Sequence, residues 1–263
     1  MTQAIGIEDR LAREIEHFEQ HYAQEAACGI EPLGAFDRHR YTTPPAQTVY
    51  PREYYYHLLA PLAGKDTLEI ACGNGIDACL CAHNGANVHA YDLSPKSIQM
   101  VRQRAAVNGL SDRVRLQVTG RFEEAFAGQR FDAIIGYASL HHIPLEGLAQ
   151  QVYDRLRPGG VAVFAEPVIN SRALHALRRM IPYYIFEPTE DEQPLNDAAI
   201  SRFAQPFDRC VRRDFQLTSR IWPMFPQIWA LAAGLHRLDH YLLKIPFLRR
   251  FATVAVFGLY RDR

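Results

Sequence analysis

The sequence lacks both a long uncharged run and an excess of charge of one sign. Its longest uncharged run, residues 221–235, is shorter than the roughly 20 apolar residues that cross a bilayer, and Pro223 and Pro226 interrupt it. Lys and Arg number 29, and Asp and Glu also number 29. Because the charges balance, no overall field attracts nucleic acid or an anionic membrane. We therefore expect no membrane span and no nucleic-acid partner.

The sequence also has few cysteines and does not begin with a secretory signal pattern. Its five cysteines are an odd number without a disulfide framework, and no second pair of zinc ligands follows Cys79 and Cys81. No cluster of carboxylates indicates magnesium. Residues 1–13 contain no basic stretch followed by an apolar core. We expect reduced thiols, no metal and a cytoplasmic protein, and the oligomeric state is left open.

The chain is long and apolar enough to form one large domain. It has 263 residues, of which 48% are hydrophobic. Apolar residues recur at helical spacing near the start of the chain, at Ile7, Leu11, Ile15, Phe18 and Tyr22. We expect residues 1–50 to form a helical cap and residues 51–263 to form the main domain. Prolines and acidic residues interrupt the pattern after residue 166, which predicts a lid insertion at 167–210.

Strand and helix patterns alternate through the main domain. Short apolar strands are expected at 67–71, 87–91, 114–118, 131–137 and 161–165, and helices at 52–62, 76–83, 94–108 and around 148–156. Strands that alternate with helices at this spacing pair in parallel, with crossover helices on both faces of the sheet. The pattern predicts a doubly wound α/β sheet. A sixth strand at 211–219, a helix at 228–243 and a last strand at 252–260 complete the chain.

A glycine-rich turn and an acidic residue follow the first two expected strands. Gly73 and Gly75 let the backbone approach a ligand closely, and Asp92 ends the second strand, where a carboxylate can accept both hydroxyl hydrogens of a ribose. The spacing Gly73-x-Gly75-x-x-Ala78 also fits a dinucleotide fingerprint. Glu69, however, lies where a pyrophosphate would approach, and it suits an ammonium group better. This favours S-adenosylmethionine over a nicotinamide dinucleotide.

Four stretches together resemble the class I S-adenosylmethionine-dependent methyltransferases of the small-molecule type 11/12 group. They are residues 68–75, 91–95, 131–135 and 156–160. The resemblance implies a Rossmann-like sheet of seven strands, the last antiparallel, with an amino-terminal cap and an insertion after the fifth strand. It implies S-adenosylmethionine as cofactor and methyl transfer to oxygen or nitrogen of a small-molecule metabolite, as in secondary metabolism.

The same resemblance implies a cofactor site around the first turn. Gly73 to Gly75 would border the methionine and the ribose, Asp92 would bind the ribose hydroxyls, and Leu93 would pack on the adenine. Ala71 stands where the family has its first glycine, and Arg121 or the backbone of Phe122 stands where the family often has an acidic residue for the adenine. The full expected set is Glu69, Ala71, Cys72, Gly73, Asn74, Gly75, Asp92, Leu93, Arg121, Phe122 and Tyr137.

Two histidines follow the fourth expected strand, on the same edge of the sheet. An imidazole titrates near neutrality, so His141 or His142 is a candidate for the base that accepts a proton from the methyl acceptor. Either side chain alternatively lines the pocket or caps the helix. Glu166, at the end of the fifth strand, is either a catalytic carboxylate or a hydrogen-bonded strand terminus.

Three other functions remain open from the sequence. The same fold and cofactor serve intramolecular cyclisation or elimination, which releases methylthioadenosine. A nicotinamide-dependent oxidoreductase and a binding protein without catalysis are the other two. No residue in the sequence identifies the acceptor.

Overall fold

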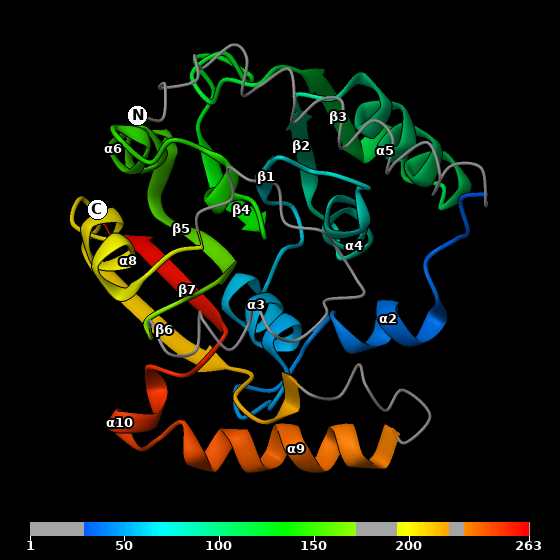
Figure 1. The fold of residues 1–263 in the computed structure, drawn as a ribbon. Coiled ribbons are helices and arrows are strands. Elements are labelled where there is room, and N and C mark those ends of the chain that lie inside the picture. The colour runs from blue at the N-terminus through cyan, green and yellow to red at the C-terminus, as the bar shows by residue number, and fades with distance from the viewer. Residues whose placement is uncertain (1–28, 172–193, 221–228, 263) are drawn as a thin grey trace, which may run out of the picture.

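The computed structural model describes residues 29–171, 194–220 and 229–262, and Figure 1 shows their arrangement. One sheet carries seven strands in the order β3-β2-β1-β4-β5-β7-β6. The strands are β1 (Asp66–Ile70), β2 (Asn87–Asp92), β3 (Val114–Val118), β4 (Phe131–Tyr137), β5 (Leu156–Pro167), β6 (Arg209–Phe215) and β7 (Val254–Arg261). Strand β7 runs antiparallel to β5 and β6, and the other pairs are parallel. The expected α/β sheet of seven strands with an antiparallel last strand is confirmed.

Helices cover both faces of this sheet (Figure 1). They are α2 (Ala35–Arg40), α3 (Pro51–Leu59), α4 (Ile76–His83), α5 (Pro95–Val107), α6 (Leu148–Arg155), α8 (Asp197–Phe203), α9 (Trp229–Leu242) and α10 (Pro246–Arg249), with short 3-10 turns η1 (Ser111–Arg113) and η2 (Leu140–His142). Alternate strand residues enter two cores. Val88 and Ala90 pack under α3, α4 and α5, whereas Leu68 and Ile70 pack under α6 and α8. Among the described helices, none combines the length and the apolar character that crossing a membrane requires.

Several elements begin or end where local chemistry requires it. Ser94 caps α5, because its side chain accepts a hydrogen bond from the Ser97 amide at 3.3 Å, and Pro95 follows at the first helical position. The expected helix around 148–156 is shorter, since α6 ends at Arg155 and Leu156 already pairs with Phe131 in β5. Arg157 precedes a proline, which disfavours helical backbone at that residue.

The carboxyl-terminal strands are shifted from their expected ranges. Strand β6 ends at Phe215 instead of residue 219, because Gln216 has a positive φ of 60° that turns the chain out of the sheet. Strand β7 begins at Val254. The expected amino-terminal helix, and residues 172–193 of the expected lid, lie outside the described residues.

Candidate active site

The turn after β1 lies at the point where the strand order reverses, between β1 and its neighbours β2 and β4. Ligands of open α/β sheets bind at the carboxyl ends of strands at such a point. Ala71, Gly73 and Gly75 have φ values of 50°, 52° and 74°. A Cβ at Gly75 would lie 2.7 Å from the Val101 side chain of α5, so both the backbone angle and the helix contact require glycine. The turn thereby brings the amino end of α4 to the edge of the sheet.

Asp92 holds this turn from the end of β2. Its carboxylate is buried, and it accepts hydrogen bonds from the amides of Gly73 and Ser94, both at 2.9 Å. The Ser97 hydroxyl donates to the Gly73 carbonyl at 2.5 Å. Burial raises the pKa of Asp92, although the Ser94 and Gly73 amides act in the opposite direction. Asp92 therefore faces the glycine turn rather than bulk solvent.

Glu69 is a buried carboxyl group with an unused oxygen. Its side chain lies near the end of β1, and its Oε2 has no hydrogen-bond partner among the described residues. Burial raises the pKa of Glu69 well above its ordinary range, Asp77 and Asp92 raise it further, and Arg52 opposes them. A buried acceptor without a partner is costly unless a ligand supplies the donor.

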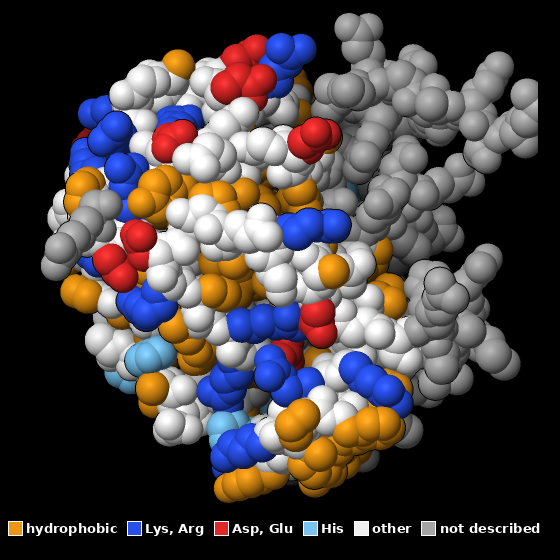
Figure 2. Space-filling view, turned by 90° about the vertical axis from the view of Figure 1, so that its left-hand side faces the viewer, with side chains coloured by type: hydrophobic (Ala, Val, Ile, Leu, Met, Phe, Trp, Pro, Cys, Tyr) orange, Lys and Arg blue, Asp and Glu red, His pale blue; other side chains and the backbone are white. Residues whose placement is uncertain are grey.

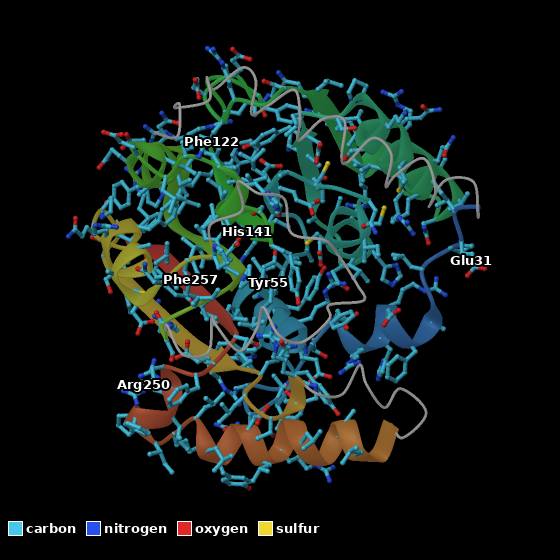
Figure 3. All side chains as sticks on the ribbon, viewed as in Figure 1. Glu31, Tyr55, Phe122, His141, Arg250 and Phe257 are labelled. Atoms are coloured by element: carbon cyan, nitrogen blue, oxygen red, sulfur yellow. The ribbon has the colours of Figure 1, made fainter. Side chains whose placement is uncertain are left out.

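The opposite wall of the site comes from α3. Arg52 donates to Asp77 at 3.2 Å, and the Tyr56 hydroxyl donates to the same carboxylate at 2.6 Å. The Arg52 guanidinium lies 4.3 Å from the ring centroid of Tyr137, which ends β4. The ring of Tyr55, labelled in Figure 3, meets Tyr137 edge-on at 5.6 Å. This wall carries a cation beside the acidic groups.

Sequence analysis missed Arg52 and Asp77. Asp77 had a local signal, because it stands two residues after Gly75 in the first turn of α4. Arg52 had none, because it reaches the site from a helix that precedes the whole sheet. Glu69 interacts with two other buried carboxyl groups, Asp77 and Asp92, and with the guanidinium of Arg52. Such an arrangement favours a ligand that carries positive charge near Glu69.

A histidine and a glutamate form a second buried group beside this notch. The His141 Nδ1 atom lies 2.8 Å from Oε2 of Glu166, and Oε1 of Glu166 accepts hydrogen bonds from the amides of Ser139 at 2.9 Å and Leu140 at 2.8 Å. His141 lies on η2, just after β4, and Figure 3 shows it near the centre of the molecule. The His142 ring centroid is 4.0 Å from that of His141.

The contact with Glu166 determines the tautomer of a neutral His141 ring. A carboxylate has only acceptors, so the proton of the neutral imidazole lies on Nδ1 and the lone pair on Nε2. Glu166 is thus a hydrogen-bonded strand terminus, as one of the two expectations had it. It also orients the imidazole that sequence analysis selected as a candidate base.

The structure places most expected cofactor residues at the carboxyl ends of three adjacent strands. These are Glu69, Ala71, Cys72, Gly73, Asn74, Gly75, Asp92, Leu93 and Tyr137. Leu93 is half-buried, which leaves surface for a ligand. Arg121 is exposed and pairs with Glu124 at 3.8 Å, and the Phe122 side chain is buried in the core under α6. The cofactor roles of these residues stay predictions. In the part of the chain that the structure describes, no three metal-binding side chains converge.

Known proteins share the sequence of this central region. Residues 67–160 match the family described as "Methyltransferase domain". A ubiquinone biosynthesis O-methyltransferase from Paracidovorax citrulli is 32% identical over 116 residues, which is 44% of this chain and 49% of the relative. A methyltransferase named GfsG from Streptomyces halstedii is 30% identical over 45% of this chain and 43% of its own length. The chain thus spans about half the length of the curated relatives it matches.

Solved structures share the fold over more of the chain. A magnesium protoporphyrin IX methyltransferase from Synechocystis PCC 6803, with bound SAH, has a TM-score of 0.56 at 15% identity and covers 95% of this chain and 98% of its own. The cyclase SpnF has a TM-score of 0.55 at 16% identity, with 76% of each chain covered. At these identities the likeness concerns the fold alone.

Proposed function

We propose that this chain, whose residues 67–160 match the methyltransferase domain, is a class I S-adenosylmethionine-dependent methyltransferase that methylates oxygen or nitrogen of a small-molecule metabolite. The observation that carries the cofactor assignment is the buried Oε2 of Glu69, which has no partner among the described residues. Asp77 and Asp92 lie near it and repel its charge, and Arg52 attracts it. An oxygen acceptor is supported by the O-methyltransferase relative.

The residues of the notch fit the parts of this cofactor. Glu69 would bind the ammonium group, since its free oxygen can accept one of the ammonium hydrogens. Asp92 would bind the ribose hydroxyls, and Arg52 offers a cation for the carboxylate of the methionine moiety. When bound, the cofactor supplies an electrophilic methyl group on a sulfonium.

His141 would act as the base for the acceptor. Glu166 holds the Nδ1 proton, and this leaves Nε2 free to take a proton from the acceptor's hydroxyl or ammonium group. Because two backbone amides fix the other oxygen of Glu166, the imidazole cannot turn without breaking a buried contact. The arrangement positions one proton acceptor at the end of β4, next to Tyr137.

Calorimetry with the full chain tests the cofactor assignment. We expect S-adenosylhomocysteine to bind and NAD to show no heat of binding. Binding of NAD instead would contradict the proposal. Turnover is then followed with a panel of phenols, carboxylic acids and amines as acceptors. Release of S-adenosylhomocysteine supports methyl transfer, whereas release of methylthioadenosine would assign an intramolecular reaction.

The substitution Glu166→Gln tests the base. An amide in this place keeps its oxygen on the Ser139 and Leu140 amides and turns its NH2 group toward His141. The imidazole must then accept at Nδ1 and carry its proton on Nε2, where it cannot act as a base. We expect kcat to fall by roughly 100- to 10,000-fold with unchanged affinity for S-adenosylhomocysteine.

Nitrogen-15 NMR of the histidine ring gives a readout that needs no acceptor. It should show the Nδ1–H tautomer of His141 in the wild type and the Nε2–H tautomer in Glu166→Gln. Glu146→Gln, at an exposed glutamate near η2, is the matched control and should change neither quantity. If both variants keep the wild-type kcat, His141 is not the base.

A further inference from the structure

The outward side of the segment from α9 to α10 exposes four large apolar side chains. They are Leu238, Tyr241, Ile245 and Phe247, and we call them the apolar face. Tyr241 is 67% exposed and Phe247 is 60% exposed. Figure 2 shows the orange surface that gathers at the foot of the molecule, where α9 and α10 lie. A contiguous apolar surface of this kind marks an interaction site.

Positive charges border the apolar face. Lys244 lies 5.1 Å from the ring centroid of Tyr241, and the Arg250 guanidinium lies 3.9 Å from that of Phe247. Among the described residues, neither of these cations pairs with a carboxylate. Asp239, the acid of α9, faces inward and accepts hydrogen bonds from the amides of residues 217–219. The outward face therefore has apolar and basic character without an acid to balance it.

The cavity behind α9 adds to this positive field. It has a volume of about 590 Å³, lies between α3, β6 and α9, and is lined by four Arg and Lys side chains against two Asp side chains. Arg212 and Arg249 each donate a hydrogen bond to the Asp214 carboxylate, both at 2.7 Å. Arg213 donates to the Ala46 carbonyl at 3.2 Å instead of to a carboxylate. None of the cofactor or base residues lines this cavity.

We infer that the apolar face binds the surface of an anionic membrane, which is a property beyond the proposed function. Helix α9 is 14 residues long, too short to span a bilayer, so it would lie in the plane of the interface. Its apolar side chains would enter the boundary between headgroups and acyl chains, and Lys244 and Arg250 would meet lipid phosphates. A two-fold contact between copies of this chain is disfavoured, because it places the same basic residues of both copies together.

Co-sedimentation with vesicles tests this inference and requires neither cofactor nor acceptor. We expect the full chain to bind vesicles that contain phosphatidylglycerol, to bind vesicles of pure phosphatidylcholine weakly, and to be released by high salt. Replacing Tyr241→Ser and Phe247→Ser together should abolish binding. The charge reversal Lys244→Glu with Arg250→Glu should weaken it by roughly tenfold or more.

Two control variants test whether vesicle binding depends on the apolar face rather than on exposed apolar or charged residues in general. Phe36→Ser changes a phenylalanine that is 73% exposed on α2, and Arg102→Glu reverses an exposed charge on α5, so both should bind vesicles like the wild type. Unchanged affinity for S-adenosylhomocysteine and an unchanged unfolding midpoint show that the variants are folded. The inference is wrong if the wild type does not bind anionic vesicles, or if the controls lose as much binding as the face variants. It is also wrong if light scattering shows a dimer that the face variants dissociate.

Discussion

The substitution Glu69→Gln distinguishes the effect of this carboxyl group on folding stability from its effect on ligand binding. The change keeps the shape of the side chain and removes its charge. In the structure, Oε2 of Glu69 has no partner among the described residues, and Asp77 and Asp92 lie close enough to repel its charge. Removing the charge from this buried group relieves its desolvation and the repulsion from Asp77 and Asp92. We therefore expect the variant without ligand to be more stable than the wild type by about 1–2 kcal/mol at mildly alkaline pH.

The pH dependence of this gain follows from the direction of the pKa shift. Burial, then Asp77 and Asp92, raise the folded-state pKa of Glu69 above its ordinary value of 4.5. The folded protein consequently holds the proton longer than the unfolded chain, and the wild type loses stability as pH rises from 4.5 toward the folded-state pKa. The glutamine variant has no such loss. The difference between the two should vanish below the ordinary pKa.

Affinity should change in the opposite direction. A charged hydrogen bond to an ammonium group is worth about 1.5–3 kcal/mol, so Glu69→Gln should weaken binding of S-adenosylhomocysteine by roughly 10- to 150-fold. In the wild type the cationic group displaces the proton of Glu69, and affinity should therefore rise with pH. That rise should be smaller in the variant.

Two measurements with one control check this reasoning. Calorimetric titration with S-adenosylhomocysteine at several pH values gives the affinity, and urea unfolding gives the stability. Glu31→Gln, at an exposed glutamate that Figure 3 labels at the edge of the molecule, should change neither. A Glu69→Gln protein that binds as tightly as the wild type would refute the assignment of this carboxylate to the ammonium group. A loss of stability in the variant would refute the claim that burial and repulsion make the Glu69 charge unfavourable in the folded protein.

Two further substitutions test the backbone of the turn after β1 and the hydrogen bonds of Asp239 on α9. Ala71 has a φ of 50°, a backbone conformation that costs an L residue about 1–2 kcal/mol. Ala71→Gly should therefore raise the free energy of unfolding, measured by urea titration, by roughly 0.5–1 kcal/mol. A lower free energy of unfolding would contradict the assigned backbone angle. Burial would raise the pKa of Asp239, but hydrogen bonds from Ser219 and Thr218 outweigh it and hold the pKa below 3.8. Its stabilisation is therefore present above that value and is lost as pH falls through the folded-state pKa. Asp239→Asn should cost about 1–3 kcal/mol near neutral pH and much less in acid, and an equal cost at both would contradict the hydrogen-bonded carboxylate.

Local sequence patterns predicted the sheet well because each pattern reflects one local cause. The strands at 114–118 and 131–137 and the helix at 76–83 have the expected bounds. The positive φ angles at 73 and 75 favour glycine, the Val101 contact requires it at 75, and the Ser94 side chain caps α5. The errors occur where a neighbouring constraint decides, as at Leu156, which joins β5 because it pairs with Phe131.

Sequence patterns located only those candidate site residues that lie at the end of a strand or directly after it. Glu69 lies near the carboxyl end of β1 and Asp92 ends the adjacent parallel strand β2, so the sheet alone brings them together. Arg52 instead comes from α3, and its place opposite Asp77 depends on how that helix packs across the sheet. Neither periodicity nor spacing carries that information, which is tertiary.

The carboxyl end of β4 explains why the notch and the base are adjacent. Tyr137 ends the strand, and its ring lies under the Arg52 guanidinium, which is part of the proposed cofactor site. Ala138, with a φ of 54°, then turns the chain, and its amide donates to the Ala165 carbonyl of β5 at 2.7 Å. This bond fixes the turn against the strand that carries Glu166, and His141 follows within one short turn of η2. The position of the proposed base relative to the proposed cofactor site is consequently set by the pairing of β4 with β5.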